Sequence, residues 1–175
     1  CLAGDFGDFI AIDPHIGSVL YAADRFESKP KIEGWLKQGY VVVLDRYVSA
    51  NQIHQGGKIH DAKKQKEFLQ WLDQMEHGVF GLPRPDRIVY LDVPVEVSQK
   101  LLSLEEQTRK KVYLKKGQKD QAENSPKHLA ESRTNALRLV KKLNAWTKID
   151  CTQKGEMLSR EAIAEKVWKA VIKTL

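Results

Sequence analysis

Two short apolar runs constrain the fold of this chain more than any other feature of its sequence. Gly39–Asp45 reads G-Y-V-V-V-L-D, and Arg87–Val93 reads R-I-V-Y-L-D-V. Unbroken runs rich in β-branched residues are typical of strands that are buried on both faces of a sheet. A third and weaker strand is predicted over Thr147–Cys151. Helical patterns lie between these runs, so the sequence predicts an α/β fold of three layers, α/β/α, around a mostly parallel sheet.

Apolar residues at helical spacing occur before, between and after the predicted strands. We expect helices over residues 16–37, over residues 61–77, and from Glu96 to about Ser103. The first of these is expected to divide into two pieces near Pro30, because proline removes a helical hydrogen bond. The last helix follows Ser159, the expected N-cap, and its apolar stripe places Trp168 in the core.

Composition limits the class of protein. With 175 residues, of which 42% are hydrophobic, the chain is long enough for a single domain over residues 1–175. No apolar run approaches the roughly 20 residues that cross a bilayer, so we expect a soluble, cytoplasmic protein that does not bind membranes. Two cysteines without C-x-x-C spacing and five scattered histidines indicate no protein-ligated metal. The net charge of +6 favours anionic partners such as nucleotides.

The pair Asp45-Arg46 stands at the end of the first predicted strand. In open parallel α/β sheets, ligands bind beyond the carboxyl ends of the strands. A carboxylate at that place suits the water shell of Mg²⁺ or the orientation of an acceptor, and a guanidinium suits bidentate binding of a phosphate. A surface salt bridge is the alternative interpretation of this dipeptide.

Two further groups of polar residues favour a nucleotide site. Asn51, His54 and Gln55 follow the strand end and precede a Gly56-Gly57 turn, and a buried connector would not carry so many hydrogen-bonding groups without a partner. Tyr21 and Arg25 share one helix face at i and i+4. An aromatic ring there is suited to stacking on a base, and a guanidinium to donating to a base carbonyl. A surface Tyr–Arg pair is the alternative.

The segment Asp45-Arg-Tyr-Val-Ser-Ala-Asn-Gln-Ile-His-Gln-Gly-Gly57 resembles the D-R-Y/H-x-x-S…Q-G-G segment of the thymidylate kinase family. Tyr21-Ala-Ala-Asp-Arg25 is similar to the family's aromatic-arginine pattern, and Gly81–Asp86 and Tyr90–Glu96 extend the resemblance. It implies the P-loop nucleotide kinase fold, transfer of the γ-phosphoryl group of ATP with Mg²⁺ to thymidine 5′-monophosphate, and a homodimer.

The resemblance also implies roles for individual residues. Those implied for substrate binding are Tyr21, Arg25, Arg46, Asn51, His54 and Gln55, of which Tyr21, Arg25 and Asn51 are implied to contact the base. Those implied for catalysis are Asp45, Arg46 and Arg109. Arg109 lies in a charged stretch, residues 103–125, that is expected to form a lid over the ATP phosphates, and Arg133 is a weaker candidate for the same task. His54 departs from the aromatic residue usual in the family, which puts sugar discrimination in question.

One part of such an enzyme is absent from the sequence. No G-x-x-x-x-G-K-[ST] phosphate loop occurs between Cys1 and Leu175. We therefore expect a phosphate loop to precede Cys1 in the complete protein, and the 175 residues alone to be inactive.

Three other functions remain open at this stage. The first is a kinase of the same fold that acts on another nucleoside or monophosphate. The second is a catalytically inactive homologue that binds nucleotides, which the missing loop favours. The third, a basic nucleic-acid-binding module, is the weakest, because the sequence contains no recognisable docking motif.

Overall fold

The computed structural model describes residues 10–108 and 125–174, without the side chains of residues 104–108. The chain divides into two compact units, one of Ala11–Arg84 and one that contains Pro85–Leu175. The prediction of one domain over residues 1–175 concerns how the two units are joined, and it stays a prediction.

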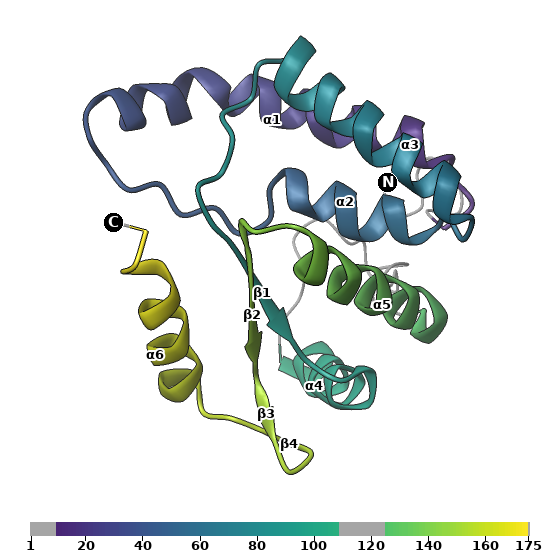
Figure 1. Cartoon of the computed structure of the whole chain (residues 1–175). Helices are drawn as coiled ribbons and strands as arrows, with labels where there is room; N and C mark the ends of the chain where they lie inside the picture. The colour runs from purple at the N-terminus through teal and green to yellow at the C-terminus, as the bar shows by residue number, and fades with distance from the viewer. Residues whose placement is uncertain (1–9, 109–124, 175) are drawn as a thin grey trace. The chain divides into compact units, whose positions relative to one another are not determined.

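Helices build the unit Ala11–Arg84. They are α1 (Pro14–Lys37), α2 (Val48–Gly57), α3 (Ala62–Asp73) and the π-helix η1 (Gln74–Val79). Helices α1, α2 and α3 pack against one another (Figure 1). Side-chain caps set two of their starts: Asp13 Oδ1 accepts the amide of His15 at 2.8 Å, and Asp61 Oδ1 accepts the amide of Lys64 at 2.8 Å. The helix predicted over residues 61–77 is therefore confirmed, with a π-helical turn added at its end.

The core of this unit has two parts. One is a cluster of Ile32, Tyr47, Val48 and Leu82, against which Val42 and Phe80 pack. The other is the α3 stripe of Phe68 and Leu72, both fully buried. The ring of His15 on α1 meets the Phe68 ring edge-on, with 5.1 Å between centroids, so α1 and α3 are joined by aromatic contact.

The expected break near Pro30 is wrong, because α1 runs through Pro30 without interruption. Contacts hold the helix on both sides of the proline. Lys29 Nζ donates to the carbonyl oxygen of Phe80 at 3.0 Å, and Ile32 is buried in the core. These contacts keep the helix continuous despite a proline cost of about 3 kcal/mol.

The strand predicted over Gly39–Asp45 is also wrong, because residues 40–44 form no strand in the described structure. Only Val42 packs against the core, whereas Val43 is 86% exposed. A β-branched run becomes a strand when a neighbouring strand satisfies its backbone groups, and no described strand pairs with this one.

The unit that contains Pro85–Leu175 mixes helices and strands. Its elements are β1 (Ile88–Asp92), α4 (Val95–Thr108), α5 (Pro126–Lys142), β2 (Trp146–Asp150), β3 (Thr152–Gln153), β4 (Glu156–Met157) and α6 (Arg160–Val171). Strand β1 pairs with β2 in parallel, from Ile88 opposite Trp146 to Asp92 opposite Asp150, and β3 and β4 form a short antiparallel hairpin. Figure 1 shows α5 and α6 on opposite sides of the β1–β2 pair. The strands predicted over 87–93 and 147–151, the parallel pairing and the helix after Pro94 are confirmed.

The last helix has the predicted cap but not the predicted core residue. Ser159 Oγ accepts the amide of Ala162 at 3.2 Å, as expected for an N-cap. Trp168, however, is 57% exposed, so its assignment to the core is wrong. The described strand pair that α6 contacts is narrow and covers only part of the apolar stripe, leaving Ile163 and Val167 half-buried.

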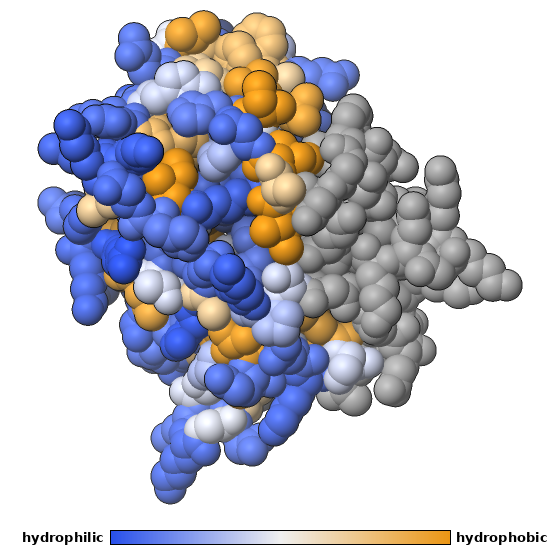
Figure 2. All heavy atoms as spheres, turned by 90° about the vertical axis from the view of Figure 1, so that its right-hand side faces the viewer, coloured by the Kyte–Doolittle hydropathy of each residue, from blue (hydrophilic) through white to orange (hydrophobic). Residues whose placement is uncertain are grey.

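Hydrophilic residues cover most of the described surface in the view of Figure 2. Among the described residues, no helix has both the length and the apolar character that a membrane crossing requires.

Candidate functional site

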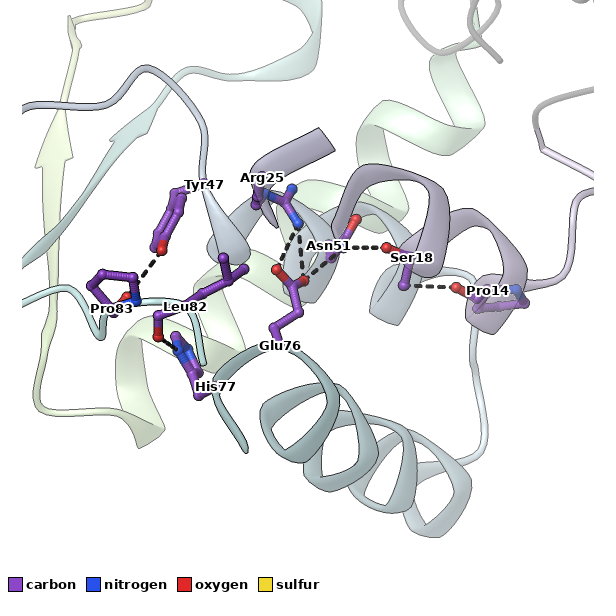
Figure 3. Close-up of polar contacts among 9 residues, drawn as sticks. All are labelled: Pro14, Ser18, Arg25, Tyr47, Asn51, Glu76, His77, Leu82 and Pro83. Carbon is purple, nitrogen blue, oxygen red and sulfur yellow. Dashed lines mark hydrogen bonds and ion pairs between the residues drawn. The ribbon is translucent and has the colours of Figure 1, made fainter. Parts of the chain in front are cut away.

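A buried polar centre in the unit Ala11–Arg84 joins three of its helices (Figure 3). Glu76 of η1 is completely buried. Nη1 of Arg25, on α1, donates to both oxygens of Glu76, at 2.9 Å to Oε1 and 2.8 Å to Oε2. Nδ2 of Asn51, on α2, donates to Oε1 of Glu76 at 2.8 Å. One buried carboxylate thus connects two residues that the sequence predicts to bind the substrate.

Sequence reasoning missed Glu76, although a signal was present. Phe68, Leu72 and Glu76 follow one another at i, i+4 and i+8, and all three are buried. The acid therefore occupies a position of the apolar stripe, where a charge is costly unless it is paired. A carboxylate in register with a buried stripe indicates a partner from elsewhere in the fold.

The hydrogen bonds of Asn51 fix the orientation of its amide. The amide nitrogen lies 2.8 Å from Oε1 of Glu76 and 3.1 Å from the carbonyl oxygen of Ser18. A carboxylate and a backbone carbonyl only accept hydrogen bonds, so the atom between them has to be the NH₂ group. Because the amide is planar, its oxygen Oδ1 points away from Glu76.

Gln55 lies one turn after Asn51 on α2 and is also buried. Its Oε1 is buried without a hydrogen-bond partner in the described structure. The side-chain amide packs against Gly17 of α1, where an added Cβ would lie 3.0 Å from Nε2. Glycine at this position permits the close approach of α1 and α2 that brings Arg25 and Asn51 to the same carboxylate.

Asp45 and Arg46 lie on an exposed bend directly before α2. Arg46 has a φ of 65°, in the left-handed region that costs a residue with a side chain about 1–3 kcal/mol and that recurs at functional sites. The next residue, Tyr47, anchors the bend, because its hydroxyl donates to the carbonyl oxygen of Pro83 at 3.1 Å. Burial raises the pKa of Tyr47 to about 12, and the negative charge of Glu76 adds to this rise.

The remaining predicted substrate residues lie on the same helices. Tyr21 stands on α1 one turn before Arg25, His54 stands on α2 one turn before Lys58, and both are half-buried. Arg25 is nearly buried, with 12% of its side chain exposed.

Arg109 and Arg133 are the residues predicted to contact the phosphoryl group during its transfer. Arg109 and most of the predicted lid, residues 103–125, fall outside the described residues. Arg133 of α5 binds Asp92 at the end of β1, with Nε 2.7 Å from Oδ1 and Nη2 3.2 Å from Oδ2. The hydrogen bond to Asp92 raises the pKa of the Arg133 guanidinium. In the described structure, Arg133 therefore already has an anionic partner.

Among the described residues, no three or more histidine, cysteine, aspartate and glutamate side chains lie together in a group that could hold a metal ion.

Comparison with known proteins decides the family. The family model for thymidylate kinase matches residues 9–162, which is most of the chain. The chain belongs to the thymidylate kinase family. The family has the P-loop nucleotide kinase fold, and the parallel β1–β2 pair between helices agrees with that α/β class.

Several curated relatives carry the same name. The "Probable thymidylate kinase" of Pyrobaculum aerophilum is 31% identical over 90 residues, which cover 51% of this chain and 42% of that protein. The "Thymidylate kinase" of Mycobacterium tuberculosis is 36% identical over 98 residues, covering 55% of this chain and 44% of that protein. The "Thymidylate kinase" of Mesoplasma florum is 25% identical over 168 residues, covering 93% of this chain and 73% of that protein. The chain thus spans less than half the length of the first two relatives.

Proposed function

We propose that the protein phosphorylates thymidine 5′-monophosphate to the diphosphate, with MgATP as the phosphoryl donor. The observation that carries this proposal is the match of the thymidylate kinase family over residues 9–162. The buried centre supports it, because Arg25 and Asn51, which the resemblance assigns to the base, converge on one carboxylate although they come from different helices.

In the proposed site, residues at two places in the unit Ala11–Arg84 bind different parts of the acceptor nucleotide. Tyr21 stacks on the base, Arg25 and Asn51 bind its edge, and His54 and Gln55 line the sugar side. Arg46, on the exposed bend before α2, binds the acceptor phosphate through its guanidinium. Asp45 beside it orients the acceptor, and Arg109 caps the transferring group.

The chemistry of Asp45 fits a magnesium ion bound mainly by phosphates. Mg²⁺ at nucleotide sites keeps several waters and takes one or two carboxylates, so a full protein cage is not required. Asp45 offers one exposed carboxylate on the bend that carries Arg46. When bound, the metal neutralises charge on the donor phosphates.

The direct test is a coupled assay of the full-length protein that follows ADP release. We expect turnover that thymidylate stimulates, and a preference for thymidylate over cytidylate. Preference for another acceptor would support a kinase of the same fold for that acceptor, and binding of thymidylate without turnover would support an inactive homologue. ATP turnover that thymidylate does not stimulate would reject the proposal.

A paired substitution tests the role of Arg46. We expect Arg46→Ala to lower kcat/KM for thymidylate by about 100-fold, since it removes a charge-assisted contact to a reacting phosphate. Arg84→Ala is the matched control, because Arg84 is an exposed arginine of the same unit that binds only Asp73 among the described side chains. Equal kinetics for the two variants would remove Arg46 from the site.

The proposal includes a homodimer, as the family resemblance implies. Exposed apolar residues at helical spacing on α1 support it, namely Ile16, Val19, Leu20 and Phe26. A second copy would cover this stripe. Size-exclusion chromatography with light scattering should give a dimer for the wild type and a monomer for Leu20→Asp; a monomeric wild type would contradict this part of the proposal.

The proposal also places the protein in the cytoplasm. The buried thiol of Cys151 is free, which suits a reducing compartment. Cell fractionation with an antibody to the protein tests this location.

A further inference from the structure

Among the described residues, the buried carboxylate of Glu76 is the one charged group that contacts both residues proposed to bind the base edge, Arg25 and Asn51. Neither the sequence patterns nor the family resemblance assigns it a role. Its two neighbours come from α1 and α2, so a single side chain on η1 sets the geometry of both.

The contacts leave a defined set of hydrogen-bonding atoms unused. Among the described residues, Arg25 bonds through Nη1 alone, so the donors on Nη2 and Nε remain. Asn51 uses its NH₂ group on Glu76 and Ser18, so its acceptor Oδ1 remains. In Figure 3 a guanidinium nitrogen of Arg25 and the amide oxygen of Asn51 both point away from the Glu76 carboxylate.

A donor beside an acceptor matches one class of pyrimidine. Thymine and uracil present a carbonyl oxygen, O4, next to an N–H, N3. Cytosine presents an amino group next to an unprotonated N3, which is the reverse pattern. Donors on Arg25 and an acceptor on Asn51 therefore fit thymine and uracil and oppose cytosine.

The pattern depends on Glu76 being a carboxylate. Both of its oxygens are acceptors, and they hold two Nη1–H bonds from Arg25 and one N–H bond from Asn51. A glutamine at this position would offer one acceptor and one donor, so Arg25 or Asn51 would face a donor. The Ser18 carbonyl opposes a flip of the Asn51 amide, so the mismatch would displace the side chains and not simply reverse the pattern.

We propose that Glu76 is a positioning residue that fixes Arg25 as the donor and Asn51 as the acceptor toward the base, and so selects thymine-type bases over cytosine. This inference rests on the proposed function, because it requires that Arg25 and Asn51 bind the base of a pyrimidine monophosphate. Glu76 itself acts through these two residues and does not touch the base.

The test is the binding of three nucleotides to the full-length protein, dTMP, dUMP and dCMP, measured by calorimetry for the wild type and Glu76→Gln. We expect Glu76→Gln to lower the binding affinity for dTMP and for dUMP by at least about tenfold. This corresponds to the loss of one hydrogen bond to a charged group. Binding of dCMP should change less, so the dTMP:dCMP preference falls while the dTMP:dUMP preference stays as in the wild type. In turnover, KM for dTMP should rise more than kcat falls, since the base lies away from the transferred group.

Asp73→Asn is the matched control. It is the same acid-to-amide change in the preceding turn, and it also removes a carboxylate that binds an arginine, but that pair is solvent-exposed and lies apart from Arg25 and Asn51. We expect all three affinities to match the wild type. Glu76→Asp keeps the charge but shortens the side chain by one methylene, and it should also lower the dTMP:dCMP preference. This variant replaces Glu76→Gln in the test if Glu76→Gln does not fold.

Two outcomes separate the inference from the proposed function. A wild type that binds dTMP and dCMP equally overturns the function on which the inference rests. The role of Glu76 alone is overturned if the wild type prefers dTMP but the folded Glu76 variants bind all three nucleotides with affinities that are equally reduced or unchanged.

Discussion

Each of the two units contains a carboxylate that binds an arginine from a different element, but the two pairs differ in their access to solvent. In the unit Ala11–Arg84, Glu76 is completely buried, and the side chain of Arg25 is 12% exposed. In the other unit, Asp92 is buried, but Arg133 is 35% exposed. The distances are alike, 2.8 Å for Arg25–Glu76 and 2.7 Å for Arg133–Asp92.

A tyrosine accompanies each pair. The pKa of Tyr47, near Glu76, and that of Tyr90, near Asp92, are both raised to about 12. Burial is the main cause in both cases, the carboxylate adds to it, and the arginine opposes it. The local chemistry of the two centres is therefore closely similar.

The difference in burial determines what each pair does for the fold. Water replaces a lost partner of Arg133 because a third of that side chain is already hydrated. Among the described residues, Arg25 would lose its hydrogen-bond partner with Glu76, whereas Asn51 would keep the carbonyl oxygen of Ser18. Contact distance alone is thus a poor guide to the importance of a charged pair, and burial is the better one.

The largest expected effect on stability follows from breaking the buried pair of Arg25 and Glu76. Glu76→Ala leaves Arg25 unpaired in a buried place, and we expect it to lower the free energy of unfolding by about 3–5 kcal/mol. Urea denaturation, monitored by circular dichroism, measures this loss. A loss under about 1 kcal/mol would show that solvent reaches the centre.

Breaking the partly exposed pair of Arg133 and Asp92 should cost less stability. Asp92→Asn removes the charge that Arg133 binds, and we expect a loss of about 1–2 kcal/mol, the lower range for hydrogen bonds to charged groups. The same denaturation experiment applies. If the loss equalled that of Glu76→Ala, the contrast in burial would not explain the two centres.

The tyrosines give a pH-dependent test. Because the folded pKa of Tyr47 is about 12 and the ordinary value is 10.0, its stabilising contribution is complete below pH 10 and is lost as the pH rises toward 12. Tyr47→Phe should lower stability at neutral pH by about 1 kcal/mol, the hydrogen bond to Pro83, and should reduce the loss of stability between pH 10 and 12. An unchanged alkaline slope would contradict the burial of this hydroxyl. Tyr90→Phe is the corresponding measurement in the other unit.

The smallest effect is expected where both partners are exposed. Arg84 donates to Asp73 at 2.6 and 2.8 Å, and this pairing lowers the pKa of Asp73. Asp73→Asn should nevertheless change the free energy of unfolding by less than about 1 kcal/mol, since solvent screens the pair. The contribution of this pair is present above the ordinary pKa of 3.8 and is lost as the pH falls below it, so the variant should match the wild type most closely in acid. A larger loss at neutral pH would undo the ranking by burial.

Local pattern was enough to predict much of the architecture. The strands at 87–93 and 147–151 and the cap at Ser159 were predictable because caps and apolar runs act over a few residues. The predicted site residues Tyr21, Arg25, Asn51, His54 and Gln55 stay predictions of function, as do Asp45 and Arg46. What the structure adds is that two of them, Arg25 and Asn51, meet at one carboxylate.

The errors share a cause. Residues 40–44 have the composition of a strand, but no described strand lies beside them. Trp168 belongs to an apolar stripe that the described strands cover only in part. Pro30 lies in a helix that is kept intact by contacts on both sides of the proline. Each outcome depends on a neighbour that is distant in the chain.

The sequence by itself determined the family, the strands at 87–93 and 147–151, the last helix, and the residue types available to a nucleotide site, because these follow from motifs and from interactions between residues a few positions apart. Only the tertiary structure decided that Glu76 is buried and that it binds Arg25 and Asn51 together. Glu76 lies 51 residues along the chain from Arg25, and no local pattern specifies a contact over that separation; the packing of α1, α2 and η1 creates it.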